Sequence, residues 1–306
     1  MNAVSARRLA ARFQRRWLVV AATLLVGASS TMAALDLAAL WDFADPAASE
    51  RRFVAAMGGA SADERLILQT QIARTHGLRG DFARARELLA AIGPVLPAAS
   101  PEVRVRHALE LGRTHASAAH RPEQLTAADR ETAREHFTRA AGLAAQARLD
   151  GLAIDALHMM VFVETDPARQ LEWNRRALAV LERSDQPEAR RWEGALRHNL
   201  GYALVLQEDH EAAIEQFRLA RAAHERAGRT RNVRIADWMV AWTRRLQKRY
   251  DEALALQLEL ERAWERDGQS DPAVWRELEA IYRALGDEAR ARDYAARQAR
   301  PAPGGR

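Results

Sequence analysis

The segment Asn199–Ala220, NLGYALVLQEDHEAAIEQFRLA, decides the fold. Apolar residues recur at spacings of three and four in 200–204 and again in 213–220, which places each set on one face of a helix. The polar residues 207–210 separate the two helices. A small residue such as Gly201 predicts a close approach of one helix to the other. The segment is therefore expected to form an antiparallel helix pair, whose apolar faces are buried only when neighbouring pairs stack against it.

The same spacing recurs at four places in the chain. Each time, an apolar residue of the first helix precedes an alanine of the second helix by thirteen residues. Unrelated amphipathic helices would not share one spacing across separate pairs, so the recurrence indicates an internal repeat. The four combinations are Ile72 with Ala85, Leu200 with Ala213, Val240 with Ala253, and Leu278 with Ala291.

This pattern resembles that of the tetratricopeptide repeat (TPR) family, which has Leu-Gly in its first helix and Ala-x3-Phe in its second. Leu200-Gly201 and Ala213-x3-Phe217 match it most fully. The resemblance implies an all-α fold, a right-handed superhelical solenoid of about six antiparallel helix pairs. The resemblance is to a bacterial-looking member of this family. The abundance of Ala and Arg and the single lysine are typical of a biased coding background.

Two units depart from the family's pattern. Leu111-Gly112 and Ala133-x3-Phe137 match its two halves, but about nine additional residues around 120–126 lie between them. The unit at 153–181 is degenerate, and Pro167 is expected to begin its second helix. The units repeat irregularly, every 38–46 residues, whereas the family's usual repeat is about 34. Longer helices or linkers are therefore expected.

The repeat pattern divides the chain into segments. Residues 35–59 are expected to form N-terminal capping helices, and residues 60–300 the TPR-like array. The Pro- and Gly-rich residues 301–306 are expected to be a disordered tail. Residues 1–31 precede the predicted domain.

Residues 1–31 have two interpretations. Basic residues followed by the apolar run Trp17–Val26 and small residues are typical of a signal peptide. If apolar character continues over 17–35, the segment is instead a membrane anchor, and the body would be exported or held in the periplasm on the inner membrane. Alternatively, translation begins at Met32, which would give a cytoplasmic protein without a membrane segment. Both interpretations remain open, with translation from Met32 slightly favoured.

The charge distribution argues against a nucleic-acid partner. The net charge is +5, but residues 1–31 hold five arginines and no acidic residue. Without these five, 41 basic residues face 41 acidic ones, so the body is neutral. A nucleic-acid-binding domain usually concentrates basic charge on its folded part.

Motifs of catalysis are missing from the sequence. There is no cysteine, no H-E-x-x-H, no G-x-S-x-G and no P-loop. His115 and His120 flank the additional residues, but two histidines without a third ligand are a weak metal site. The sequence therefore predicts no enzyme, no cofactor and no metal.

The resemblance also implies a binding surface, since TPR arrays line a concave groove with residues of their first helices. Trp238, Trp242 and Arg245 lie at i, i+4 and i+7 on one such helix, and Trp and Arg often dominate binding energy at interfaces. The alternative is that the two tryptophans pack in the core. The full set of candidate groove residues is Arg74, Arg113, Met159, His198, Asn199, Tyr202, Trp238, Trp242, Arg245, Arg276 and Arg283.

These observations predict a non-catalytic adaptor or assembly module that binds a protein or peptide in the groove. The alternative is a regulatory module that binds a signal peptide or small molecule and controls a partner. The residues around 120–126 are a second candidate surface.

Overall fold

The computed structural model describes residues 35–299, and none of these residues lies in a β-strand. The chain divides between Ala39 and Leu40 into two compact units, of which the first is described from residue 35 onward. The predictions for residues 1–31 and 301–306 lie outside the described residues, as does nearly all of the segment 17–35. Among the helices of residues 35–299, none is both long and apolar enough to cross a membrane.

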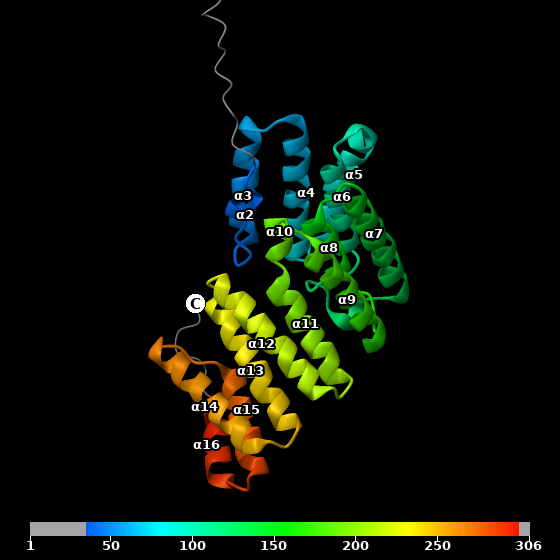
Figure 1. The fold of residues 1–306 in the computed structure, drawn as a ribbon. Helices are drawn as coiled ribbons and strands as arrows, with labels where there is room; N and C mark the ends of the chain where they lie inside the picture. Colours follow the sequence, from blue (N-terminus) through cyan, green and yellow to red (C-terminus); the bar gives the residue numbers. More distant parts are fainter. Residues whose placement is uncertain (1–34, 300–306) are drawn as a thin grey trace, which may run out of the picture. The chain divides into compact units, whose positions relative to one another are not determined.

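The second unit is an array of helix pairs (Figure 1), each made of a first helix and a second helix. This confirms the predicted all-α fold of antiparallel helix pairs. The pairs are α4 (Ala62–Leu78) with α5 (Phe82–Ile92), α6 (Pro101–Arg113) with α7 (Ala127–Gln146), α8 (Asp150–His158) with α9 (Pro167–Arg183), α11 (Glu193–Leu206) with α12 (His210–Arg226), α13 (Thr230–Leu246) with α14 (Tyr250–Arg266), and α15 (Pro272–Ala284) with α16 (Glu288–Gln298).

Shorter helices complete the described chain. α2 (Leu37–Leu40) begins in the first unit, and α3 (Pro46–Ala56) packs against α4 in the second. The buried side chain of Phe53 lies in α3. The remaining short elements are α10 (Pro187–Arg190) and the 3-10 helices η1 (Met57–Gly59), η2 (Gly93–Ala98), η3 (Pro122–Gln124) and η4 (Met159–Phe162).

The thirteen-residue spacing has a structural cause in the turn within each pair. In all four units with this spacing, the residue eight positions after the first apolar residue has a positive φ, and three residues separate the two helices. A left-handed residue ends a helix, and this turn then fixes the register of the next one. The alanine thirteen residues on is buried in every case. The left-handed residues are Gly80, Glu208, Lys248 and Gly286.

The expected close approach of two helices occurs at Gly201. A Cβ atom built there would lie 2.6 Å from Cε1 and 2.8 Å from Cδ1 of Phe217 in α12. The Phe217 ring is fully buried, so it packs directly on the backbone of α11. Gly112 and Phe137 repeat this contact between α6 and α7. The Leu-Gly and Ala-x3-Phe halves therefore meet in the second pair too, despite its longer connection.

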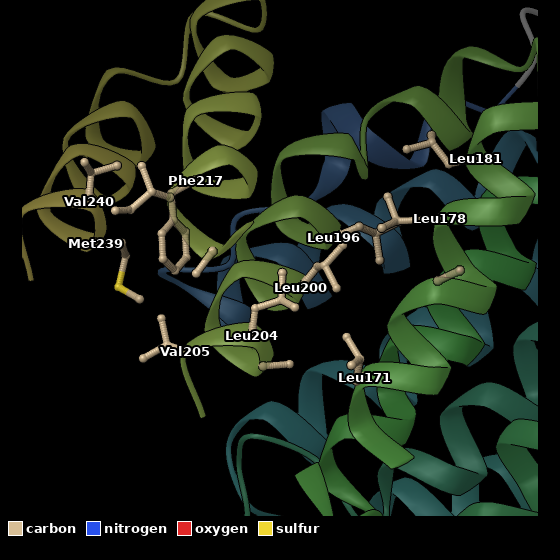
Figure 2. Packing of buried hydrophobic residues seen from close by; sticks show 14 of the residues in the cluster. Leu171, Leu178, Leu181, Leu196, Leu200, Leu204, Val205, Phe217, Met239 and Val240 are labelled. Carbon is tan, nitrogen blue, oxygen red and sulfur yellow. The ribbon is translucent and has the colours of Figure 1, made fainter. Parts of the chain in front are cut away.

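Apolar clusters join successive pairs. Figure 2 shows one that reaches from Leu171 in α9 through Leu196 and Leu200 in α11 to Phe217 in α12 and Val240 in α13. Each pair therefore completes the core of its neighbours, as in a repeat protein.

Local signals begin the helices where the sequence indicates. Ser61 and Glu64 form a capping box at the start of α4. Pro167 is the first residue of α9, and Asp166 caps it by accepting a hydrogen bond from the N–H of Ala168. The degenerate third unit is therefore a helix pair as well.

Candidate functional site

A chain of side-chain contacts links the six first helices, from α4 to α15. Each contact joins one first helix to the next. We call its members the first-helix stripe: Arg74, Glu110, Arg113, Asp155, His158, Asn199, Tyr202, Trp242, Arg245 and Glu277.

The stripe begins at Arg74, whose guanidinium group packs on two aromatic rings. The Arg74 guanidinium lies 5.3 Å from the centre of the Trp41 ring and 5.4 Å from that of Phe43. These two rings stack on each other, and the Trp41 Nε1–H donates to Oε1 of Gln71, 3.2 Å away. Two cation–π contacts and one hydrogen bond thus hold the segment before α3 against α4.

Four charged residues form a buried network between α4, α6 and α8. Arg113 donates to Glu110 Oε1 and to Asp155 Oδ1, both at 2.5 Å, while Arg74 Nη1 lies 3.9 Å from Glu110 Oε1. The side chains of Glu110 and Asp155 are 3% and 9% exposed, so their charges require these partners.

The network sets the charge states of its members. Burial alone would raise the pKa of Asp155, but the guanidinium groups of Arg113 and Arg74 outweigh it and lower that pKa. Burial also opposes the charge of Arg113, yet Asp155 and Glu110 raise its pKa. Burial and the nearby Arg113 lower the pKa of Arg74. Two guanidinium groups and two carboxylates alternate along this network, in the order Arg74, Glu110, Arg113 and Asp155.

His158 continues the stripe to α11. Burial lowers the pKa of His158, which favours its neutral form. Its Nδ1 lies 3.0 Å from Nδ2 of Asn199, so a neutral ring accepts the amide hydrogen bond. The neighbouring His198 lies on the Phe217 ring, with 5.7 Å between ring centres, and burial lowers its pKa as well.

The stripe is aromatic between α11 and α13. The Tyr202 and Trp242 rings are nearly parallel with centres 6.2 Å apart, and Trp242 and Trp238 repeat this arrangement at 6.1 Å. Both tryptophans are partly buried against the apolar core, whereas Tyr202 is 46% exposed. Trp242 therefore supports the exposed tyrosine, and Trp238 supports Trp242.

Arg245 ends the stripe by binding Glu277 of α15 through two hydrogen bonds, of 2.6 and 3.0 Å. The other two predicted arginines are on the surface of α15. Arg283 is exposed and pairs with Glu279 at i−4, and Arg276 is exposed as well. Neither of them contributes to the chain of contacts described above.

The sequence-predicted residues therefore have different environments. Arg74, Arg113, Asn199, Tyr202, Trp242 and Arg245 belong to the stripe, His198 and Trp238 pack beside it, and Met159 is buried. The guanidinium groups of Arg113 and Arg245 already bind carboxylates of the protein. Spacing along one helix could not reveal this, because the acidic partners lie on neighbouring pairs.

Sequence reasoning missed the acidic members of the stripe, although a signal for some of them exists. In four units a polar residue stands immediately before the apolar first-helix residue of the repeat pattern, which is Ile72, Leu111, Leu200 or Leu278. This position holds Gln71, Glu110, Asn199 and Glu277, and all four make the side-chain contacts described here.

A pocket of about 120 Å³ lies beside the charged network. Residues of α4 and α6, the segment 117–119 and residues of η4 line it, and it opens to solvent. Its lining is Ala73, Arg74, Gly77, Leu78, Glu110, Arg113, Thr114, Ser117, Ala118, Ala119, Met159 and Phe162.

No metal-binding group occurs within residues 35–299, where three or more His, Asp or Glu side chains would have to converge. His115 lies 3.6 Å from Asp129, while His120 stacks on Phe82 and lies near the Thr114 carbonyl. The two histidines thus face different partners.

Solved structures with a similar fold include the apo form of RapI, with a TM-score of 0.64 and 11% identity over 83% of this chain and 70% of RapI. A second is the STAND protein PH0952 from Pyrococcus horikoshii, which has a TPR sensor. Its TM-score is 0.57 with 13% identity, over 83% of this chain and 44% of that one. No family model matches the chain, and no curated protein matches its sequence.

The helix pairs, their Gly–Phe contacts and these similar folds define the class of the protein. By its fold, the chain is a TPR-like helical repeat protein.

Proposed function

We propose that the chain is a non-catalytic module that binds a protein or peptide along the first-helix stripe. The observation that carries this proposal is the exposed Tyr202, which stacks on Trp242, itself stacked on Trp238, within the chain of contacts that links successive first helices. A rigid, half-exposed aromatic residue is the type that dominates binding energy at interfaces.

The contacts of the stripe favour binding over catalysis. Its charged groups are arranged as mutual ion pairs, which hold side chains in place. The Arg245–Glu277 pair, for example, fixes the end of α13 against α15, on the helix that carries Trp242. A partner would therefore meet a pre-organised surface, which reduces the entropy lost on binding.

A regulatory role is the second candidate. The similar fold in PH0952 is described as a sensor, and this chain spans less than half of that protein. In this role the same stripe would bind a signal peptide or small molecule, and a partner would read the change.

The experiment compares partner capture by the full chain and two variants. Tyr202→Ala removes the exposed ring, and Leu285→Ala removes a similarly exposed apolar side chain at the end of α15. Affinity purification with mass spectrometry should identify a partner whose affinity falls at least about tenfold with Tyr202→Ala and is unchanged with Leu285→Ala.

Circular dichroism controls for folding, since Tyr202 is exposed and both variants should keep their helicity. If a partner binds all three proteins equally, the stripe is not the binding surface. Turnover of a captured small molecule by the purified chain would contradict the non-catalytic assignment.

A further inference from the structure

The pocket beside the charged network has a mostly apolar lining and one polar side. Leu78, Met159 and Phe162 supply large apolar side chains, and Arg74 and Glu110 supply the polar side. An apolar cavity of about 150 Å³ holds a benzene molecule. At about 120 Å³, this pocket fits an apolar group of four or five heavy atoms.

The additional residues of the second pair build one wall of the pocket. Ser117, Ala118 and Ala119 line it. His120 fixes this segment, because its ring stacks on Phe82 of α5 at 3.8 Å between centres and its Nδ1 lies 3.0 Å from Ser117 Oγ. The longer connection therefore has a defined place next to the stripe.

The polar side of the pocket has unused hydrogen-bonding capacity. Oε2 of Glu110 and Nε of Arg74 are buried, and neither has a hydrogen-bond partner within the described part of the chain. Leaving such groups unpaired is costly. The Glu110 Oε2 atom is an acceptor, and the Arg74 Nε–H group is a donor.

We propose that this pocket binds a leucine- or methionine-sized side chain of a peptide, whose adjoining peptide group bonds to Glu110 and Arg74. The inference rests on the proposed binding function and names the chemistry of its ligand. Because Glu110 Oε2 and Arg74 Nε are both buried, a ligand reaches them only when these two side chains rotate toward it. For Glu110 this rotation is about a torsion with a broad minimum, and it brings Oε2 to the ligand while the carboxylate stays beside Arg113.

The free acceptor and the free donor favour a peptide group over a carboxylate or an ammonium group. A peptide group offers one N–H donor and one carbonyl acceptor, which complement the free carboxylate oxygen and the free guanidinium N–H. A fatty acid would bring its carboxylate against Glu110, and an amine would bring its ammonium group against Arg74. The small volume excludes a long acyl chain.

Gly77 provides a way to fill the pocket without straining the fold. It lies within α4 and lines the pocket, and a Cβ built there meets nothing within 4 Å beyond the adjacent residues and backbone of its own helix, among the described residues. Gly142 in α7 is also helical with equally open surroundings, but it is not among the pocket's lining residues. Gly77→Leu and Gly142→Leu are therefore a matched test and control.

The test uses the full chain labelled at its methionine methyl groups and observed by NMR, with Met159 assigned by its loss in Met159→Leu. The probes are N-acetyl-leucine N-methylamide, N-acetyl-alanine N-methylamide and isovalerate. We expect the leucine probe to shift the Met159 methyl resonance saturably, and the alanine probe to bind at least about tenfold more weakly. Gly77→Leu should abolish the shift, and Gly142→Leu should preserve it.

Several results would overturn the inference. These are the absence of a Met159 shift, equal binding of the leucine and alanine probes, or an unchanged shift in Gly77→Leu. Isovalerate binding as tightly as the leucine probe would overturn the peptide assignment. Partner capture that depends on Tyr202, without probe binding, would refute the pocket alone. Probe binding without such capture would refute the proposed function and leave the pocket.

Discussion

Replacing Gly201 by alanine tests the contact that defines the repeat. The added Cβ would lie between 2.6 and 2.9 Å from three ring atoms of Phe217. Real Cβ contacts are longer, and the ring is fully buried within the cluster of Figure 2. Either the ring or α11 must therefore move.

Two opposing effects set the magnitude. Overpacking a core costs about 1–3 kcal/mol, whereas alanine in place of glycine inside a helix contributes about 1 kcal/mol. Because the neighbouring atoms belong to a rigid buried ring, we expect the upper part of the cost. Gly201→Ala should therefore lower the free energy of unfolding by about 1–2 kcal/mol and the Tm by roughly 2–8 °C. The larger Gly201→Trp should disrupt the fourth pair.

Urea unfolding followed by circular dichroism measures the effect. Gly142→Ala is the matched control, because its Cβ would meet open space, and it should stabilise by up to about 1 kcal/mol. In a Phe217→Leu background, Gly201→Ala should cost less, since the smaller side chain relieves the overlap. If Gly201→Ala stabilises the chain as much as Gly142→Ala does, the assigned Gly–Phe packing is incorrect.

Two further predictions concern the stripe. Asp155→Asn should lower the free energy of unfolding by about 3–5 kcal/mol, because it removes one of the two carboxylates that bind the buried Arg113. A loss below about 1 kcal/mol in urea unfolding would contradict the network. Burial lowers the pKa of His158 and of His198 in the folded state. The stability that these neutral histidines contribute is therefore complete above their pKa in the unfolded chain, about 6.5. It declines as the pH falls from there toward their lower pKa in the folded chain. Unfolding curves at about pH 7.5 and about pH 5.5 should therefore differ, less so in His158→Gln, and identical curves would refute this assignment.

The sequence by itself determined the helix pairs, because the signals that form them are local. The turn after Leu200 requires a left-handed residue and a capping aspartate within a few positions, and Asp209 caps α12 by accepting from the N–H of Ala212. The buried faces follow from spacings of three and four, and the Gly201–Phe217 contact follows from one small and one large residue at fixed places.

Only the tertiary structure decided what the polar residues of the first helices do. Arg245 and Glu277 are 32 residues apart and belong to different pairs, as do Arg113 and Asp155 at 42. Their contacts depend on how pairs stack, which no periodicity along one helix encodes. The pocket requires the same stacking, because its walls come from α4, α6, the segment 117–119 and η4. The sequence thus indicated candidate binding residues, and packing between repeats determined which of them are held by partners and which face solvent.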